Sequence, residues 1–243
     1  MYIIKLDAIA STNTYLKDLA SVTLPKDYTI VVAEKQTQGR GQMGAEWHSE
    51  SGKNLTASVF KKLPSINVSD QFYISMTVSL AIFKALSVFK IPQLRIKWPN
   101  DILSADTKLC GILIENVIKN NSLQGSIIGF GLNLNQKFFD NLPNASSMSL
   151  LTGVIYNKDE VLFEVLKQLR VYFNLLESKK HAEIKLEYES LLFRKEKPST
   201  FRTSKDESFS GIIKGVTDYG HLKVWTEDEL IKTFDLKEIK LLF

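Results

Sequence analysis

The sequence contains a single cysteine, Cys110, in 243 residues. One cysteine cannot close an internal disulfide, which fits a reducing compartment, and we expect Cys110 to be a small buried residue on a strand. Histidine is also scarce, and His48, His181 and His221 lack the spacing of a metal site. The N-terminus has no signal-peptide pattern, and no apolar run approaches the roughly 20 residues of a membrane span. We therefore expect a cytoplasmic protein without a membrane segment.

Neither sign of charge dominates the sequence, which carries 31 Lys and Arg against 27 Asp and Glu. The net charge of +4 suits anionic partners, such as a nucleotide or an acidic carrier domain, and does not demand nucleic acid. With 44% hydrophobic residues, the chain has enough apolar material for the core of a soluble globular protein. Its length allows one domain, or a large domain followed by a small one.

Hydrophobic patterning predicts both strands and helices over most of the chain. Alternating segments indicate strands, and segments that are apolar at helical spacing indicate helices. Ser11 or Thr12 is typical of a helix N-cap, and Asn120-Asn121 is typical of a hairpin turn. The predicted strands cover residues 2–6, 28–33, 54–60, 95–98, 111–118 and 124–130, and the predicted helices cover residues 11–20, 70–89, 159–176 and 182–193.

The pattern changes near Lys195, after a charged stretch that ends in Pro198. Short strands then alternate with turns: residues 200–202, 209–213, 221–225 and 231–234, with a turn at 218–220. Short strands with regular turn signals are typical of a small β-barrel. We therefore predict two domains, residues 1–194 and 195–243.

A glycine-rich segment lies between residues 39 and 54. Gly39, Gly41 and Gly44 have the spacing of a dinucleotide-binding motif, but such a motif must open a helix. Here Trp47 and a loop-like composition follow, so that interpretation is rejected. The alternatives are a flexible surface hairpin or an anion-binding loop. Its glycines would let backbone N–H groups approach a phosphate or carboxylate, and Arg40 could form two hydrogen bonds to it.

Four other segments carry polar residues at the ends of predicted elements. Lys97-Trp98-Pro99-Asn100-Asp101 ends a strand, and in Lys108-Leu109-Cys110-Gly111-Ile112-Leu113-Ile114-Glu115 a loop lysine enters an apolar strand. Residues 127–135 form a strand with two glycines, and Ser11-Thr12-Asn13 precedes a helix. In this order, and with the glycine-rich segment, these motifs resemble those of the biotin–protein ligase family, closely over residues 1–135 and loosely beyond.

The resemblance implies an α+β fold: a mixed β-sheet with helices, like the catalytic domain of class II aminoacyl-tRNA synthetases, and a small C-terminal SH3-like β-barrel. It also implies a two-step reaction. Biotin attacks the α-phosphate of ATP to give biotinyl-5'-adenylate, and a lysine of a biotin carboxyl carrier protein, part of a biotin-dependent carboxylase, then takes the biotin. Because an anion attacks an anion in the first step, fixed cations and Mg²⁺ are expected at the developing charge.

The site residues follow from the same resemblance. Lys108 would be the main catalytic residue, with Arg40 from the loop that closes over the adenylate. Asp101 would be an oxygen ligand of the type that Mg²⁺ accepts. The biotin side would comprise Ser11, Thr12, Asn13, Gln36, Gly39, Arg40, Lys108, Gly111 and Gly129, and the ATP or adenylate side Gly41, Gly44, Trp47, Lys97, Asn100, Lys108 and Asn133.

Three of these residues also fit a purely structural role when each is taken alone. Lys97 could pack its stem at the edge of the core, Asp101 could complete the turn after Pro99, and Lys108 could be a solvated surface charge. A lipoate–protein ligase shares the expected fold and chemistry. A biotin-sensing repressor and a non-catalytic biotin-binding protein are further alternatives.

The sequence also departs from the family pattern. Many members carry Arg at the positions of Gln42, Met43 and often Ala45, so loop cations are missing here. The regulatory members carry an N-terminal helix-turn-helix domain, for which the expected motif at Ser11 leaves no room. We therefore expect no DNA binding, and a monomer or a weak homodimer.

Overall fold

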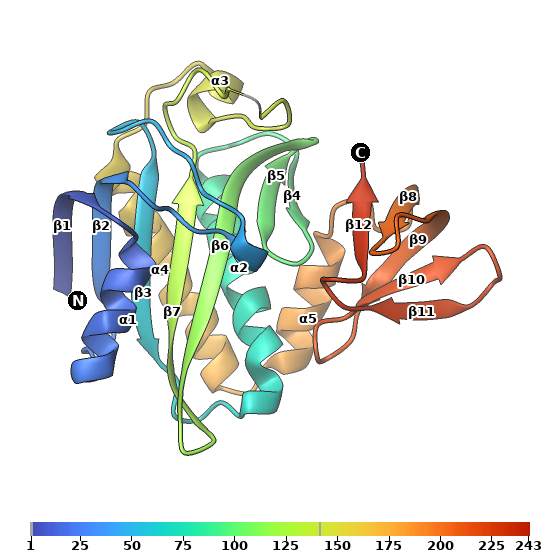
Figure 1. The fold of residues 1–243 in the computed structure, drawn as a ribbon, viewed down its shortest axis with the longest axis horizontal. Coiled ribbons are helices and arrows are strands. Elements are labelled where there is room, and N and C mark those ends of the chain that lie inside the picture. Colours follow the sequence, from blue (N-terminus) through green and yellow to red (C-terminus); the bar gives the residue numbers. More distant parts are fainter. Residues whose placement is uncertain (1, 141) are drawn as a thin grey trace.

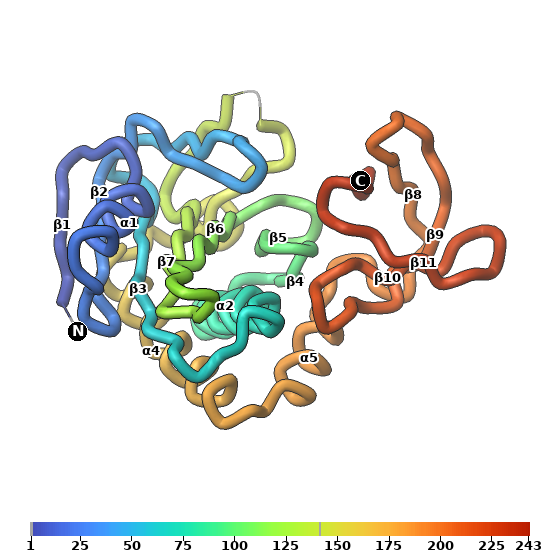
Figure 2. Tube along the Cα trace, turned by 60° about the horizontal axis from the view of Figure 1, so that its bottom comes forward, coloured from blue at the N-terminus to red at the C-terminus, as the bar shows by residue number. Residues whose placement is uncertain are grey.

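The computed structural model describes residues 2–140 and 142–243, whose strands form two sheets (Figure 1). Met1, where the resemblance and the first predicted domain begin, lies outside the described residues, as does Asn141. Helices pack on the larger sheet, and the smaller sheet lies beside it, next to β4, β5 and α5 (Figure 2). The expectation of a mixed α+β fold is confirmed.

The larger sheet has seven strands in the order β1-β2-β3-β7-β6-β5-β4. β1 and β2 pair in parallel, and the other neighbours pair antiparallel. β6 and β7 form a long hairpin, whose turn at Asn120-Asn121 places both residues at positive φ, as a two-residue hairpin turn requires. The strands are β1 (Tyr2–Ile9), β2 (Thr29–Gln36), β3 (Leu55–Lys62), β4 (Leu94–Lys97), β5 (Asp101–Ser104), β6 (Thr107–Lys119) and β7 (Ser122–Leu132).

Helices cover both faces of this sheet. α1 (Thr12–Val22) contacts β2, β3 and β7 and covers a small apolar cluster that includes Leu16 and Phe60. The larger core lies on the other face, under α2 (Gln71–Val88) and α4 (Lys158–Glu177). Because both faces are covered, β3 is buried along nearly its whole length. The remaining helical segments are η1 (Gln42–Gly44), η2 (Val68–Asp70), α3 (Met148–Thr152) and α5 (His181–Ser190).

Helix α2 is the most buried helix of the core. The stretch Val68–Val88 has the length and composition to cross a membrane, so the expectation that no apolar run approaches that length was wrong. The fold accounts for this composition, because 67% of an 18-residue window of this stretch is buried inside the protein, against the sheet, α4 and α5. A helix that is apolar nearly all round is what the centre of a sizeable core requires.

The second sheet has five antiparallel strands in the order β11-β10-β9-β8-β12. Its buried side chains, among them Phe201, Ile213 and Val224, belong to the same apolar cluster as the core under α2. Trp98 Nε1 donates to the carbonyl of Gly220 at 2.8 Å, which joins the turn after β4 to this sheet. The strands are β8 (Pro198–Thr203), β9 (Ser208–Val216), β10 (Leu222–Thr226), β11 (Ile231–Phe234) and β12 (Ile239–Leu242).

Candidate active site

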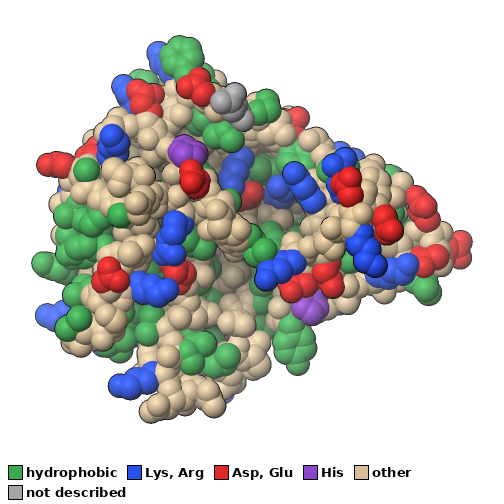
Figure 3. Space-filling model, in the orientation of Figure 1, with side chains coloured by type: hydrophobic (Ala, Val, Ile, Leu, Met, Phe, Trp, Pro, Cys, Tyr) green, Lys and Arg blue, Asp and Glu red, His purple; other side chains and the backbone are tan. Residues whose placement is uncertain are grey.

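A cavity of about 540 Å³ lies between the two sheets and opens as a hollow in the surface (Figure 3). One wall comes from α1, the glycine-rich loop and strands β4 to β7, and the other comes from β8, β9, β10 and β12 and neighbouring turns. Most of the predicted site residues meet here although they lie far apart in the sequence. Those that line the cavity are Ser11, Thr12, Asn13, Gln36, Arg40, Gly41, Trp47, Lys97, Asn100, Asp101, Lys108, Gly111 and Gly129.

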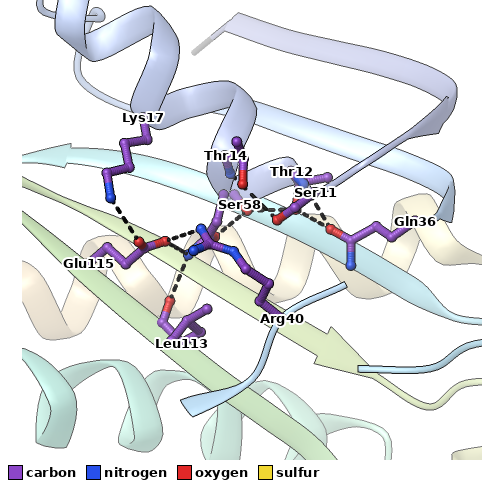
Figure 4. A network of polar contacts seen from close by, with 10 residues as sticks. Ser11, Thr12, Thr14, Lys17, Gln36, Arg40, Ser58, Leu113 and Glu115 are labelled. Carbon is purple, nitrogen blue, oxygen red and sulfur yellow. Dashed lines mark hydrogen bonds and ion pairs between the residues drawn. The ribbon is translucent and has the colours of Figure 1, made fainter. Parts of the chain in front are cut away.

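At one end of the cavity, the start of α1 forms a buried polar network (Figure 4). Ser11 caps the helix by accepting from Thr14 N–H, so capping and cavity lining coexist at this residue. Thr12 donates its backbone N–H and its hydroxyl to Gln36 Oε1, at 2.8 and 3.0 Å. The hydroxyl of Ser58 contacts Thr12 Oγ1 at 2.7 Å and Asn13 Oδ1 at 2.6 Å. These fixed amides and hydroxyls suit a small polar head group.

The close fit of this end depends on a glycine of β7. A Cβ atom at Gly129 would overlap the side-chain amide of Asn13, so the packing of α1 on the sheet requires glycine there. Asn13 is held on its other side as well, since its Nδ2 donates to Leu113 O at 3.3 Å and to Glu115 Oε2 at 2.9 Å.

Trp47 lies over a flat part of the sheet made by two more glycines. Gly111 of β6 and Gly131 of β7 are direct cross-strand partners, and a Cβ atom at Gly131 would overlap the indole ring. The indole Nε1 is buried and has no hydrogen-bond partner among the described residues. The Lys108 Nζ lies 5.6 Å from the ring centroid, within cation–π range.

Lys108 lies at the start of β6, and both its ammonium group and its backbone are held by polar contacts. Its Nζ pairs with Asp101 Oδ1 at 2.7 Å, and the other oxygen of Asp101 lies 3.9 Å from Lys97 Nζ. Its backbone N–H donates to Asn144 O at 2.7 Å, and its carbonyl accepts from Ser146 N–H at 3.0 Å. Two ammonium groups therefore share one carboxylate beside the glycines, which leaves net positive charge on this wall.

The second sheet adds further cations to the opposite wall: Arg202, Lys237 and Lys240 line the cavity. Burial lowers the pKa of Lys97, and the nearby charges of Lys108 and Lys240 lower it further, while Asp101 opposes the shift. Lys97 Nζ also lies 5.0 Å from the ring centroid of Phe243. The middle of the cavity is therefore cationic on both walls and suits a polyanion such as a phosphate chain.

Arg40 binds a different partner from the two lysines. Its guanidinium donates to Glu115 Oε2 at 3.0 Å, toward the α1 end of the cavity (Figure 4). Glu115 belongs to β6, and none of the sequence motifs indicated a role for it.

Three predicted site residues are absent from the described lining of the cavity. Gly39 is buried at the start of the loop, where a Cβ atom would overlap the carbonyl of Trp47. Gly44 is exposed at φ +80°. Asn133 is buried, and its Nδ2 donates to Ser146 O at 3.0 Å, which supports the segment that holds Lys108. Their predicted contacts with biotin or nucleotide stay predictions.

Several lining or supporting residues were not identified from the sequence. Ser58 had no signal beyond its place on an apolar strand, and Glu115 was a carboxylate in an otherwise apolar run. Arg202 and Lys240 could not be found, because their position depends on how the second sheet docks. Cys110 is buried as expected, and burial raises the pKa of its thiol, so it is no candidate nucleophile.

Comparisons with known proteins match both the sequence and the fold. The model of the biotin/lipoate A/B protein ligase family matches residues 6–133. The bifunctional ligase/repressor BirA of Bacillus spizizenii is 30% identical over 237 residues, which cover 96% of this chain and 72% of that protein. The biotin–[acetyl-CoA-carboxylase] ligase of Mycobacterium tuberculosis is 28% identical over 171 residues, which cover 68% of this chain and 62% of that protein.

The biotin protein ligase from Aquifex aeolicus, solved in complex with biotin and ATP, superimposes with a TM-score of 0.81. It is 26% identical, and the match covers 99% of this chain and 98% of that one. A family match over more than half of the residues, a relative at 30% identity and a shared fold agree with the site geometry. This chain belongs to the biotin/lipoate A/B protein ligase family.

Proposed function

We propose that this protein is an ATP-dependent biotin–protein ligase. It joins the biotin carboxylate to the α-phosphorus of ATP, releasing pyrophosphate, and then passes the acyl group from biotinyl-5'-adenylate to a lysine amine, releasing AMP. The observation that carries the proposal is the position of Lys108, whose ammonium group stands in the cavity between a polar end and a cationic middle. The relatives named for this activity support it.

The polar end at the start of α1 is the proposed biotin site. Thr12, Gln36 and Asn13 supply fixed hydrogen-bonding groups for the ureido ring, and Gly129 and Gly111 leave room for the side chains of Asn13 and Trp47 that border it. This arrangement would direct the biotin carboxylate along the cavity toward Lys108 and Arg40. Both cations would stabilise the oxygens that gain negative charge as the new C–O–P bond forms.

The cationic middle of the cavity is the proposed ATP site. Lys97 and Asn100 lie on the same wall as Lys108, and Gly41 and Trp47 belong to the loop above it. Trp47 offers a flat face for the adenine, although its ring lies against Gly111 and Gly131 in this structure. Nucleotide binding on that face would need the indole to turn or the base to stack on its exposed side.

Magnesium fits this site as an ion shared with the substrate. Among the described residues, no group of three or more His, Cys, Asp and Glu side chains could hold a metal. Mg²⁺ commonly needs only one or two carboxylates when phosphate oxygens and water complete its shell. Asp101 would be its protein ligand, since one of its oxygens has only a distant partner in Lys97. The ion would neutralise phosphate charge when ATP is bound.

The finer assignments of fold and cellular context belong to the same proposal. Residues 1–194 would form a catalytic domain related to class II aminoacyl-tRNA synthetases, and residues 195–243 an SH3-like barrel. The meander of β8 to β11, with β12 beside β8, supports the second assignment. The acceptor would be the carrier domain of a biotin-dependent carboxylase in the cytoplasm, and the enzyme would act without DNA, as a monomer or weak homodimer.

Biotin-dependent exchange of labelled pyrophosphate into ATP tests the activity directly. We expect exchange with the wild type and its loss in Lys108→Ala, with the melting temperature nearly unchanged because the ammonium group lies in the cavity and not in the core. Lys108→Gln keeps length and polarity and should also lose exchange, by about 100-fold or more, which is typical for removal of one transition-state donor. Near-normal exchange in Lys108→Gln would refute its assigned role, and no exchange in the wild type would refute the activity.

If the protein were a lipoate–protein ligase, its substrate would be lipoate in place of biotin. A thermal-shift comparison of biotin with lipoate distinguishes the two, and we expect only biotin to stabilise the protein. A salt-dependent titration with DNA tests the repressor alternative, since phosphate contacts produce a steep salt dependence.

A further inference from the structure

Glu115 is a carboxylate that directly follows the apolar run Ile112-Leu113-Ile114 of strand β6, at the end of the cavity where α1 starts (Figure 4). One oxygen, Oε2, accepts from Asn13 Nδ2 at 2.9 Å and from Arg40 at 3.0 Å. The other oxygen lies 3.5 Å from Lys17 Nζ. Its side chain is only 21% exposed, so these contacts occur in a partly shielded position.

These contacts join three elements that are distant in sequence. Asn13 and Lys17 belong to α1, Arg40 belongs to the glycine-rich loop, and Glu115 belongs to the rigid β6–β7 hairpin. The only group that comes from the loop is the guanidinium of Arg40. Within the part of the chain that the structure describes, Glu115 is therefore the group through which the Arg40 side chain is fixed to the sheet.

The same contacts continue through the proposed biotin site. From Glu115 the network passes to Asn13, then to Ser58 and Thr12, and reaches Gln36. Gln36 ends β2 just before the glycine-rich loop, and its amide lies against Gly39. The network therefore runs from Arg40 of the loop to Gln36 at the end of β2, around the polar end of the cavity.

We propose that Glu115 is a positioning residue that holds the glycine-rich loop closed over the biotin end of the cavity through Arg40. This inference rests on the proposed function. A guanidinium carries five N–H donors, and its contact with Glu115 uses one NH₂ group. The remaining donors stay available on a side chain that lines the cavity, where they would meet the carboxylate of biotin or the acyl-phosphate oxygens of its adenylate. Glu115 orients the cation and does not touch the reacting atoms.

The first experiment uses the ligand-free protein and needs no enzyme activity. Hydrogen exchange is measured at the loop amides, including Gly41 and Trp47, whose N–H groups donate to Ala45 O and Gly39 O. Glu115→Gln removes the charge and keeps the shape, and it should speed exchange by about tenfold, as expected for loss of a hydrogen bond to a charged group. Unchanged exchange rates would overturn the proposal.

Two further variants make the first experiment specific. Arg40→Gln removes the other half of the contact at a loop position whose side chain is 43% exposed. It should speed exchange by the same factor. Lys17→Ala removes the exposed ion pair of Glu115 that does not reach the loop, and it should leave exchange unchanged. An equal effect from Lys17→Ala would mean that Glu115 only stabilises α1, and that result would also overturn the proposal.

The second experiment is a double-mutant cycle on biotin affinity. Glu115→Gln should weaken binding of labelled biotin about tenfold when Arg40 is present and clearly less in Arg40→Gln, where only its hydrogen bond with Asn13 is left to lose. Additive losses would show that Glu115 acts independently of Arg40. If the wild type does not bind biotin, the proposed function fails, whereas the exchange experiment still decides whether Glu115 closes the loop.

Discussion

At Lys97, the fold favours the neutral amine, whereas phosphate binding requires the charged ammonium group. Burial lowers the pKa of its ammonium group, and the charges of Lys108 and Lys240 add to the shift. Because the folded-state pKa is below the ordinary value, the unfolded chain binds this proton more tightly. The protonated side chain therefore destabilises the fold at neutral pH, and the penalty disappears as pH rises past 10.5. A cation kept in such a position serves a ligand and not stability.

We predict that Lys97→Met raises the melting temperature at pH 7 by about 2–4 °C, the shift that corresponds to roughly 1 kcal/mol in a chain of this size. Pyrophosphate exchange should fall by about tenfold or more, since the variant loses a charged contact to phosphate. Calorimetry at pH 7 and near pH 10 checks the first part, and the gain should shrink at the higher pH. Lys119→Met, at an exposed lysine, should do neither. A lower melting temperature with normal exchange would show that Lys97 is structural.

Gln42 stands where many members of the family carry arginine, so the effect of the missing charge can be tested at this residue. It begins η1, is half-buried and lines the cavity, while Met43 beside it is 60% exposed. An amide can donate a hydrogen bond there but carries no charge. We predict that Gln42→Arg slows the release of labelled biotinyl-adenylate in the absence of carrier, by about tenfold, through one charge-assisted hydrogen bond.

The matched control for Gln42→Arg is His48→Arg, which adds a cation to the same loop at an exposed position that does not line the cavity. It should leave release unchanged. Equal or faster release from Gln42→Arg would show that residue 42 does not face the phosphate.

At the scale of elements, glycines at alternate positions of β7 shape the floor of the cavity. Side chains on a strand alternate between faces, so Ile127, Gly129 and Gly131 share the face that α1 and the loop cover. Ile127 packs in the apolar cluster under α1, Gly129 leaves room for Asn13, and Gly131 leaves room for Trp47. The two glycines therefore convert one face of a strand from core into binding surface.

We predict that Gly131→Ala displaces the indole of Trp47, because the added methyl group would occupy the position of the ring. Tryptophan fluorescence of the ligand-free protein should shift to longer wavelength as the indole enters water. Trp98 and Trp225 provide a constant background, since neither lies against Gly131. In a Trp47→Phe background the spectrum should not respond to Gly131→Ala. A shift that persists there would mean that the strand itself has moved.

The elements with a strong pattern could be predicted from the sequence. The helix expected at residues 70–89 is α2 (Gln71–Val88), and the strand expected at 124–130 lies within β7 (Ser122–Leu132). Strand β5, helix α3 and strand β12 were missed, because each is only four or five residues long and carries no clear period. Similarly, motifs identified Lys108 and Asp101 as site residues. The ion pair between Arg40 and Glu115 could not be predicted, because it depends on packing between distant elements.

At the scale of the whole molecule, the cavity exists because the second sheet lies beside the first, against helices α2 and α5. The sheet is held by polar contacts at its edge: Tyr73 donates to Asp218 at 3.0 Å, and Val216 N–H donates to Glu189 at 2.9 Å. Burial and the bond to Asp218 raise the pKa of Tyr73 to about 12, so its hydroxyl stays protonated and donates throughout the neutral range. Docking therefore supplies both apolar contact and the second cationic wall.

We predict that a chain ending at Lys197 stays folded over the larger sheet but transfers biotin poorly and melts at a lower temperature. The reason is that removal of β8 to β12 exposes part of the shared core and deletes Arg202 and Lys240 from the cavity. Circular dichroism and transfer to a carrier domain check both parts. The full-length double variant Arg202→Gln/Lys240→Gln separates charge from docking: it should lose activity without losing stability. Normal transfer by the truncated chain would show that the second sheet has no part in the reaction.

The burial of Cys110 makes the chain convenient for spectroscopy. A thiol that stays protonated and inaccessible at neutral pH will not react with maleimide dyes. Ala45→Cys on the loop and Glu207→Cys on the second sheet would place two exposed, reactive thiols on either side of the cavity. Energy transfer between dyes at these two positions could then follow opening and closing in single molecules, with the native cysteine left in place.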